Sequence, residues 1–356
     1  MNRNIFVGLV LAGLTGVGCA DKGQETPAPS AQPSTTGALA TAAAETPDQD
    51  TLATRAYEQL RQDFAAGRAA SLRLPIYSLQ PVGDAAAQAQ ERARFLGLGS
   101  GSLMKSEDGA AVTANNWELR VDALSGAELF VDKARFHAGQ GVASLPLAEA
   151  DYIARARAHL SEKLPSAAAH NLRTYRVRRY MNDASGPGGA RAGATVYQVA
   201  VAFHEVLGEL PIIGAGGKVA VHLTPQGEFI SHESTVRDTA QRLAEVSGAG
   251  LLAPDDARRR VEEKLTADGV KLGDYKLTRA ELGYYRLGRN SVQSVLVPHY
   301  AYFYEPASRE VVGKKRLEVV PAVTDRAVLE QLRQDEQAEA ARKAELRSRA
   351  APPDRK

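Results

Sequence analysis

Hydrophobic and polar positions alternate with two different periods along the chain, and each period predicts its own kind of element. Asp84–Leu98 is helical by composition, and Leu147–Leu164 places Ile153, Ala156 and Leu160 on one face at spacings of three and four. Pro254–Leu265 begins with a proline and two acidic residues, which is typical of a helix N-terminus. The pattern therefore predicts three helices spread through the central part of the chain.

Segments with a period of two follow each predicted helix, which is the pattern of half-buried strands. "NWELRVDALSGAELFVDKARF" alternates around a turn at Ser125-Gly126. The later strands are expected at Leu172–Tyr180, Thr195–Val206, Lys218–Leu223, Glu228–Glu233, Tyr275–Leu287, Val292–Tyr304 and Glu310–Val319. This order predicts an α+β fold of repeated helix–strand–strand units, with antiparallel sheets and helices packed on one face.

The repeat divides the chain into expected domains. Three units are predicted at residues 51–145, 146–245 and 246–321, followed by a charged helical tail over residues 322–356. Thr324 or Asp325 can cap the tail helix, whose apolar stripe ends at Leu332. The remainder is mixed charge over alanine, so we expect a solvated helix. The less favoured alternative is a coiled-coil or docking helix, because the apolar heptad positions fail after Leu332.

The first residues carry an export pattern. Ile5–Leu14 is an apolar run too short to span a bilayer, so residues 1–18 are expected to be a signal peptide. "GLTGVGC" resembles the lipobox of bacterial lipoproteins, although Gly16 stands where that family has a branched apolar residue. The resemblance implies lipidation of Cys19, and Ala20 after it favours the outer membrane. Ordinary cleavage after Gly18 is the alternative.

Composition narrows the classes of partner and chemistry. Residues 19–50 are rich in Ala, Pro, Thr, Ser and Gln and are expected to form a disordered tether. The net charge of +2 and the interspersed charges argue against binding to nucleic acid. Cys19 is the only cysteine, so the folded body has no disulfide and no thiol nucleophile. We expect no cofactor.

The segment between Gly208 and Ser234 contains "GAGGK", which suggests a phosphate-binding loop. A Walker loop needs a glycine five residues before its Gly-Lys pair and Ser or Thr after it, and Ile212 and Val219 stand there. The residues are better explained as structural turns, in which Gly214, Gly216 and Gly217 adopt positive φ. The full set of expected turn residues is Gly208, Pro211, Gly214, Gly216, Gly217 and Gly227.

The histidines raise the question of a metal site. His204-Glu205 and His232-Glu233 begin like the zinc-protease motif, but neither has the second histidine that the motif requires. A metal site carried by a sheet and formed from several histidines stays open as the less favoured alternative. Its candidate ligands are His204, His222, His232 and His299.

The sequence contains no arrangement of residues typical of catalysis. There is no G-x-S-x-G elbow, Asp255-Asp256 fits helix capping, and Arg237 with Asp238 suggests a surface ion pair. Tyr300, Tyr302 and Tyr304 share one strand face. That face is either half-buried or a recognition surface, and it is the strongest candidate for binding because aromatic rings contact partners at low entropic cost.

"YQVAVAFHEVLGELPIIGAGGKVAVHLTPQGEF", at Tyr197–Phe229, resembles the propeptide modules of thermolysin-like and fungalysin-type metalloproteases and the related PepSY modules. The resemblance lies in turn residues such as Gly208, Pro211 and Gly227 and in the alternating strand between them. It implies modules that inhibit a protease domain or help it to fold. No protease domain follows in this sequence, so such a role would act in trans.

These observations lead to one expected function and two alternatives. We expect a non-catalytic, lipid-anchored protein of the bacterial cell envelope that binds a protein or an extended peptide through exposed sheet edges. The first alternative is a protease inhibitor or folding assistant acting in trans. The second, less favoured, is a metal-dependent enzyme.

Overall fold

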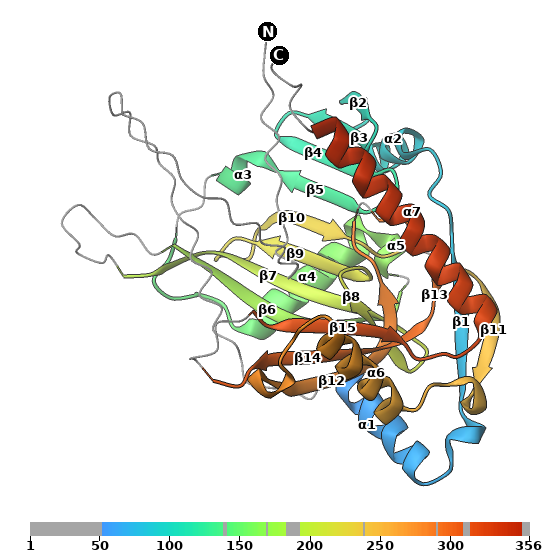
Figure 1. Ribbon diagram of the computed structural model, residues 1–356. Coiled ribbons are helices and arrows are strands. Elements are labelled where there is room, and N and C mark those ends of the chain that lie inside the picture. Colours follow the sequence, from blue (N-terminus) through green and yellow to red (C-terminus); the bar gives the residue numbers. More distant parts are fainter. Residues whose placement is uncertain are drawn as a thin grey trace, which may run out of the picture.

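The structure is a computed structural model, and it describes residues 52–137, 141–168, 170–182, 193–237, 239–289, 291–308 and 314–350. Helices α1 to α7 pack around one sheet of 12 strands and one of 3 strands (Figure 1). The large sheet is antiparallel apart from the pair β8–β12. The predicted α+β class with antiparallel sheets is therefore confirmed.

The elements follow one another as helix-led groups of strands. The first part contains α1 (Leu52–Ala65), β1 (Arg73–Leu79), α2 (Ala85–Phe95), β2 (Ser102–Ser106), β3 (Gly109–Ala114), β4 (Trp117–Asp122), β5 (Glu128–Asp132) and α3 (Lys133–His137). The middle part contains α4 (Glu149–Lys163), α5 (Pro165–Ala168), β6 (Leu172–Asn182), β7 (Thr195–Leu207), β8 (Leu210–Gly214), β9 (Lys218–Leu223), β10 (Phe229–Ser234) and β11 (Thr239–Ser247). The last part contains α6 (Pro254–Ala267), β12 (Tyr275–Arg286), β13 (Val295–Leu296), β14 (Pro298–Pro306), β15 (Arg316–Pro321) and α7 (Arg326–Ala350).

The strand order of the large sheet places the three groups side by side. It runs β15-β14-β12-β8-β7-β9-β10-β5-β4-β3-β2, and β6 pairs with β7 beside this path. Figure 1 shows β2 to β5 at one end, β12 and β14 at the other, and α7 lying diagonally between the two ends. The two ends of the path, together with β6, are the edges of this sheet.

Each group buries the apolar stripe of its helix against its own strands. The alanines of α2 pack on β3 and β4, and Tyr152, Ala156 and Leu160 of α4 pack on β7 and β9. Ala257, Val261 and Leu265 of α6 join the core that contains β12 and β14. The stripe expected on Leu147–Leu164 is thus present, and packing of these apolar faces supplies most of the stability of such helices.

Several elements were absent from the sequence-based prediction, among them α1 and β1. Helix α1 packs into the core that contains α6, β12 and β14, and Ile76 and Leu79 of β1 join the same core. Strand β1 pairs with β11 and β13 to form the small sheet. These contacts cross the boundaries predicted at residues 145 and 245, and the division into domains stays a prediction.

The glycine segment after β8 joins two strands of the large sheet. β8 leaves β7, pairs in parallel with β12, and the chain returns to β7 as β9. Gly214 and Gly217 have φ of 89° and 64°, as predicted. Gly216 does not adopt positive φ, which corrects the prediction. Glycine is required there for another reason, because a Cβ would lie 2.2 Å from the carbonyl oxygen of Leu287.

The predicted tail helix is docked over much of its length. Asp325 caps α7 by accepting from the backbone N–H groups of Ala327 and Val328. The Asp335 carboxylate accepts from the backbone and hydroxyl of Ser294, and Glu339 accepts from the backbone of Val292. The expectation of a solvated helix is therefore wrong for this part of α7, which is docked as in the alternative.

The predicted signal peptide, the tether, Cys19 and Ala20 lie outside the described residues. Among the helices that the structure does describe, none is both long enough and apolar enough to cross a membrane. The lipid anchor stays a prediction from sequence.

Candidate binding sites

The tyrosine face proposed for recognition is buried. Tyr300 and Tyr302 are 0% exposed and Tyr304 is 4% exposed. Their rings lie beneath α1 and α6, with Tyr57 meeting Tyr300 and Tyr302 edge-on at 5.9 and 6.0 Å. The prediction of a binding face here is wrong, because α1, which the sequence analysis did not identify, covers this side of β14.

The four candidate metal-binding histidines are not brought together. His232 faces α4, whereas His222 is a cross-strand neighbour of Ser231 and so lies on the other face of the sheet. His204 contacts the ring of Tyr175, and His299 is hydrogen-bonded to the carbonyl of Val297. Within the described part of the chain, no group of three His, Cys, Asp or Glu side chains is arranged to hold a metal ion.

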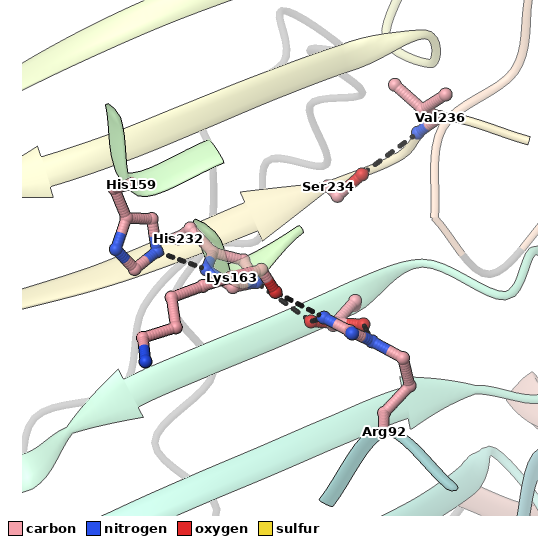
Figure 2. Close-up of polar contacts among 7 residues, drawn as sticks. Arg92, His159, Lys163, His232, Ser234 and Val236 are labelled. Carbon is pink, nitrogen blue, oxygen red and sulfur yellow. Dashed lines mark hydrogen bonds and ion pairs between the residues drawn. The ribbon is translucent and has the colours of Figure 1, made fainter. Parts of the chain in front are cut away.

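His232 instead belongs to a polar network that joins the first and middle groups of elements (Figure 2). Arg92 of α2 forms two hydrogen bonds to Glu128 of β5, at 2.7 and 2.8 Å, and a third to the carbonyl of Lys163. Glu128 also accepts from Nε2 of His232 at 2.8 Å, and His232 Nδ1 lies 3.0 Å from Nε2 of His159. Two helices and two strands are thus linked through one carboxylate.

The network sets the charges of its members. Burial raises the pKa of Glu128, but the bonds from Arg92 and His232 outweigh burial and lower that pKa to about 2. Burial, together with the nearby His232, lowers the pKa of His159 to about 3. A neutral His159 can donate Nε2–H to His232 Nδ1 while His232 donates Nε2–H to the carboxylate, so both ring nitrogens of His232 are engaged.

This arrangement lacks a nucleophile. Ser234 lies directly across from Glu128 in the β10–β5 pair, but its hydroxyl accepts from the backbone of Val236 rather than meeting a ring nitrogen. With both nitrogens of His232 already bonded, no base is poised to activate that hydroxyl. We therefore assign the network a structural role. Its partners are 36 to 104 residues apart in the chain, and no local sequence signal links them.

A second buried ion pair lies at the end of β7. Arg286 of β12 bonds Glu205 at 2.6 Å, and both side chains are almost fully buried. The other carboxylate oxygen of Glu205 lies 2.7 Å from Nδ1 of His170. Gly216 passes over Arg286, where an added Cβ would meet the arginine side chain at 2.6 Å. The "GAGGK" segment thus covers a buried ion pair.

Between these two clusters lies a cavity of about 420 Å³, a volume within the range of small-molecule sites, roughly 300–1,000 Å³. Residues of α2 and α5, the β4–β5 hairpin and the end of β10 line it. Arg237 forms part of the wall and donates to the carbonyls of Gln80 and Gln293. Asp238, its expected ion-pair partner, lies outside the described residues.

Strand β6 is the longest edge of the large sheet. It spans 11 residues, compared with 5 in β2 and 6 in β15. It pairs with β7 on one side, and no described strand pairs with its other side. Four exposed arginines lie along it: Arg173, Arg176, Arg178 and Arg179. None of the four forms an ion pair with any carboxylate among the described residues.

Three of these arginines share one face of β6. Arg173, Arg176 and Arg178 pair with His204, Ala202 and Ala200, which alternate with the β7 residues that face α4. Tyr175 lies at a β-bulge, and two cations lie over its ring. The guanidinium carbon of Arg176 is 5.4 Å from the ring centroid, and Nζ of Lys218 is 5.7 Å from it. The β6 edge therefore presents a row of positive charge beside an aromatic ring.

Comparisons with known proteins leave the family open. No protein-family model matches this chain, and no curated protein is similar to it in sequence. A solved structure of an uncharacterised protein from Eubacterium rectale is 10% identical, with a TM-score of 0.45 over 71% of this chain and 85% of that chain. A likeness at this level carries no argument about function.

Proposed function

We propose that this protein is a non-catalytic binding protein of the bacterial cell envelope that captures an extended, acidic segment of another protein along β6. The observation that carries this proposal is the long edge strand with four exposed arginines that lack carboxylate partners among the described residues. An added strand would satisfy the outward-facing backbone groups of β6. Its acidic side chains would complement the arginines.

Charge complementarity favours an acidic segment over a neutral one. Successive side chains of a strand alternate between faces, so a bound strand places every second residue next to the row Arg173, Arg176 and Arg178. Charged hydrogen bonds from arginine to carboxylate are stronger than neutral ones. A segment with acidic residues at alternate positions is therefore the best fit.

The same features have a simpler explanation, which the experiment must separate from binding. Charged residues and bulges on an edge strand prevent it from pairing with other chains, and β6 has bulges near Tyr175 and Met181. If protection were their only role, peptides of either charge would fail to bind. Selective binding of acidic peptides distinguishes the two.

The test is fluorescence anisotropy of the full chain with a labelled peptide of alternating Glu and Val. We expect saturable binding that weakens with added salt, and no binding of the matched Lys and Val peptide. N-methylation of alternate peptide amides removes main-chain donors and is expected to weaken binding about tenfold or more. Absence of binding by the acidic peptide overturns the proposal.

Charge-reversal variants locate the site. Arg176→Glu combined with Arg178→Glu is expected to weaken binding at least about tenfold, because two attractive contacts become repulsive. Arg94→Glu combined with Arg260→Glu is the matched control, since both residues are exposed and lie on other elements, α2 and α6. Equal loss in both double variants would mean that only overall charge matters.

The envelope location rests on Cys19 and is tested separately. We expect the protein to fractionate with membranes and to incorporate labelled palmitate, whereas a Cys19→Ser variant loses both properties. Membrane association without palmitate labelling would contradict the lipid anchor while leaving the peptide experiment unaffected.

A further inference from the structure

The wall of the cavity between α2, α5 and β10 contains a positive charge without a counter-charge. Arg237 donates from Nη1 and Nη2 to two backbone carbonyls, while its Nε is buried and forms no hydrogen bond. No carboxylate among the described residues forms an ion pair with it. Carbonyls fix the position of a guanidinium but do not neutralise its charge.

The charged groups near Arg237 already form ion pairs with one another. Arg286, which repels Arg237, is paired with Glu205, and Arg92, which also lines the cavity, is paired with Glu128. Burial, then repulsion from Arg286, lowers the pKa of Arg237, and Asp122 and Asp335 oppose this only at longer range. An arginine stays protonated in proteins, so one positive charge of this cluster has no counter-charge in direct contact.

The cavity beside Arg237 offers room and further donors. Gln80, Gln88 and Ser166 line it with side chains that form no hydrogen bond to the described residues. Amide and hydroxyl groups around a single guanidinium are the usual fixed donors of a small-anion site. Glu91 at the rim is exposed and negative, which disfavours anions of higher charge.

From this arrangement we propose that the cavity is a binding site for a small organic carboxylate, held by Arg237 with the side chains of Gln88 and Ser166. The bound carboxylate neutralises the guanidinium by accepting from the N–H groups of Nη1 and Nη2 that the two carbonyls leave unused. The site lies apart from the residues of β6 and does not depend on peptide binding there. A single guanidinium matches a monovalent carboxylate better than a phosphate dianion.

Isothermal titration calorimetry of the full chain at constant ionic strength tests this site. The probes are the monoanions acetate, lactate and glutamate, with inorganic phosphate as the competing anion. We expect saturable binding of at least one carboxylate with a Kd below about 1 mM, or roughly −4 kcal/mol. No saturable heat with any carboxylate overturns the proposal, and so does tighter binding of phosphate.

Variants assign the binding to the cavity. Arg237→Gln is expected to weaken binding at least tenfold, and Arg237→Lys to recover part of it because the charge returns without the fork of donors. Ser166→Phe fills the cavity and is expected to abolish binding, while Ser161→Phe on the exposed side of α4 leaves it unchanged. If Arg237→Gln fails to fold, the comparison of Ser166→Phe with Ser161→Phe still tests the site. Equal binding by these two phenylalanine variants contradicts the proposal.

Discussion

At the scale of single residues, two buried tyrosines of β14 differ in what their hydroxyl groups meet. Tyr302 donates to the carbonyl of Pro254 at 2.9 Å, whereas the buried hydroxyl of Tyr304 forms no hydrogen bond. We expect Tyr302→Phe to lower the free energy of unfolding by about 1 kcal/mol, because it removes a hydrogen bond in a buried setting. Tyr304→Phe is the control and is expected to be neutral or slightly stabilising.

Urea unfolding of both variants measures the difference. A larger loss in Tyr304→Phe than in Tyr302→Phe would contradict the described orientation of these rings. The comparison also tests the burial of the whole tyrosine face, since exposed hydroxyls would make both changes neutral.

The residues of the polar network predict a loss of stability in acid. The pKa of His159 is about 3 in the folded protein and near 6.5 when unfolded, so the unfolded chain binds more protons between these values. The neutral, buried His159 therefore does not reduce the free energy of unfolding above pH 6.5. As the pH falls from 6.5 toward 3, the unfolded chain takes up a proton that the folded protein does not, and the free energy of unfolding falls. Glu128, with a folded pKa of about 2, adds a further loss below about pH 4.5.

His159→Gln is expected to reduce the slope of stability against pH between pH 6 and 4, by up to about 1.4 kcal/mol per pH unit. The glutamine amide can still donate to His232, so stability at pH 7.5 is expected to change little. Part of the slope remains in this variant, because three other histidines also have a lowered pKa in the folded protein: His204, His222 and His299. Chemical unfolding at several pH values measures this, and an unchanged slope would contradict a neutral, buried His159.

At the scale of elements, α7 depends on contacts that its sequence does not reveal. Asp335 is buried and accepts from the backbone and hydroxyl of Ser294, whereas Glu336 beside it is exposed. We expect Asp335→Ala to lower the free energy of unfolding by about 1–3 kcal/mol, because it removes the acceptor of two partly buried donors of Ser294. Glu336→Ala is the control and is expected to change stability by less than about 0.5 kcal/mol. Equal effects would mean that α7 is not docked.

The sequence predicted elements with strong local patterns and missed those that depend on distant partners. Lys218–Leu223 matches β9 in both bounds, and the helix expected at Pro254–Leu265 is α6 with two further residues. β1 contains Pro75 and pairs with β11, which lies about 160 residues further along the chain. Helix α1 buries Tyr57 against Tyr300 and Tyr302. Periodicity cannot show which element covers a face.

The same limit applies to the sites. The arginines between Leu172 and Asn182 are visible in the sequence, but only the strand order shows that β6 is an edge. The charged residues of the two clusters, such as Arg92 with Glu128, come from different elements and follow no motif. His232 was singled out for a metal-like pattern, and its side chain is instead held by a carboxylate and a second histidine.

At the scale of the whole molecule, the three helix-led groups share one sheet, and polar contacts join them where they meet. The network around Glu128 connects the first and middle groups, and the pair Glu205–Arg286 connects the middle and last groups. The proposed recognition strand β6 leaves this path and pairs only with β7. Binding at β6 can therefore take place without rearrangement of the joined groups, which is the usual condition for strand addition to a preformed sheet.

The most direct test of strand capture is hydrogen–deuterium exchange of the full chain with and without the alternating Glu and Val peptide. The account predicts that protection on binding is concentrated in peptides covering Leu172–Asn182, because their outward-facing amides gain partners. The variant with Arg176→Glu and Arg178→Glu should lose that protection at the same peptide concentration. Protection centred on another edge such as β2, or no change at β6 while the peptide is bound, would contradict the central claim.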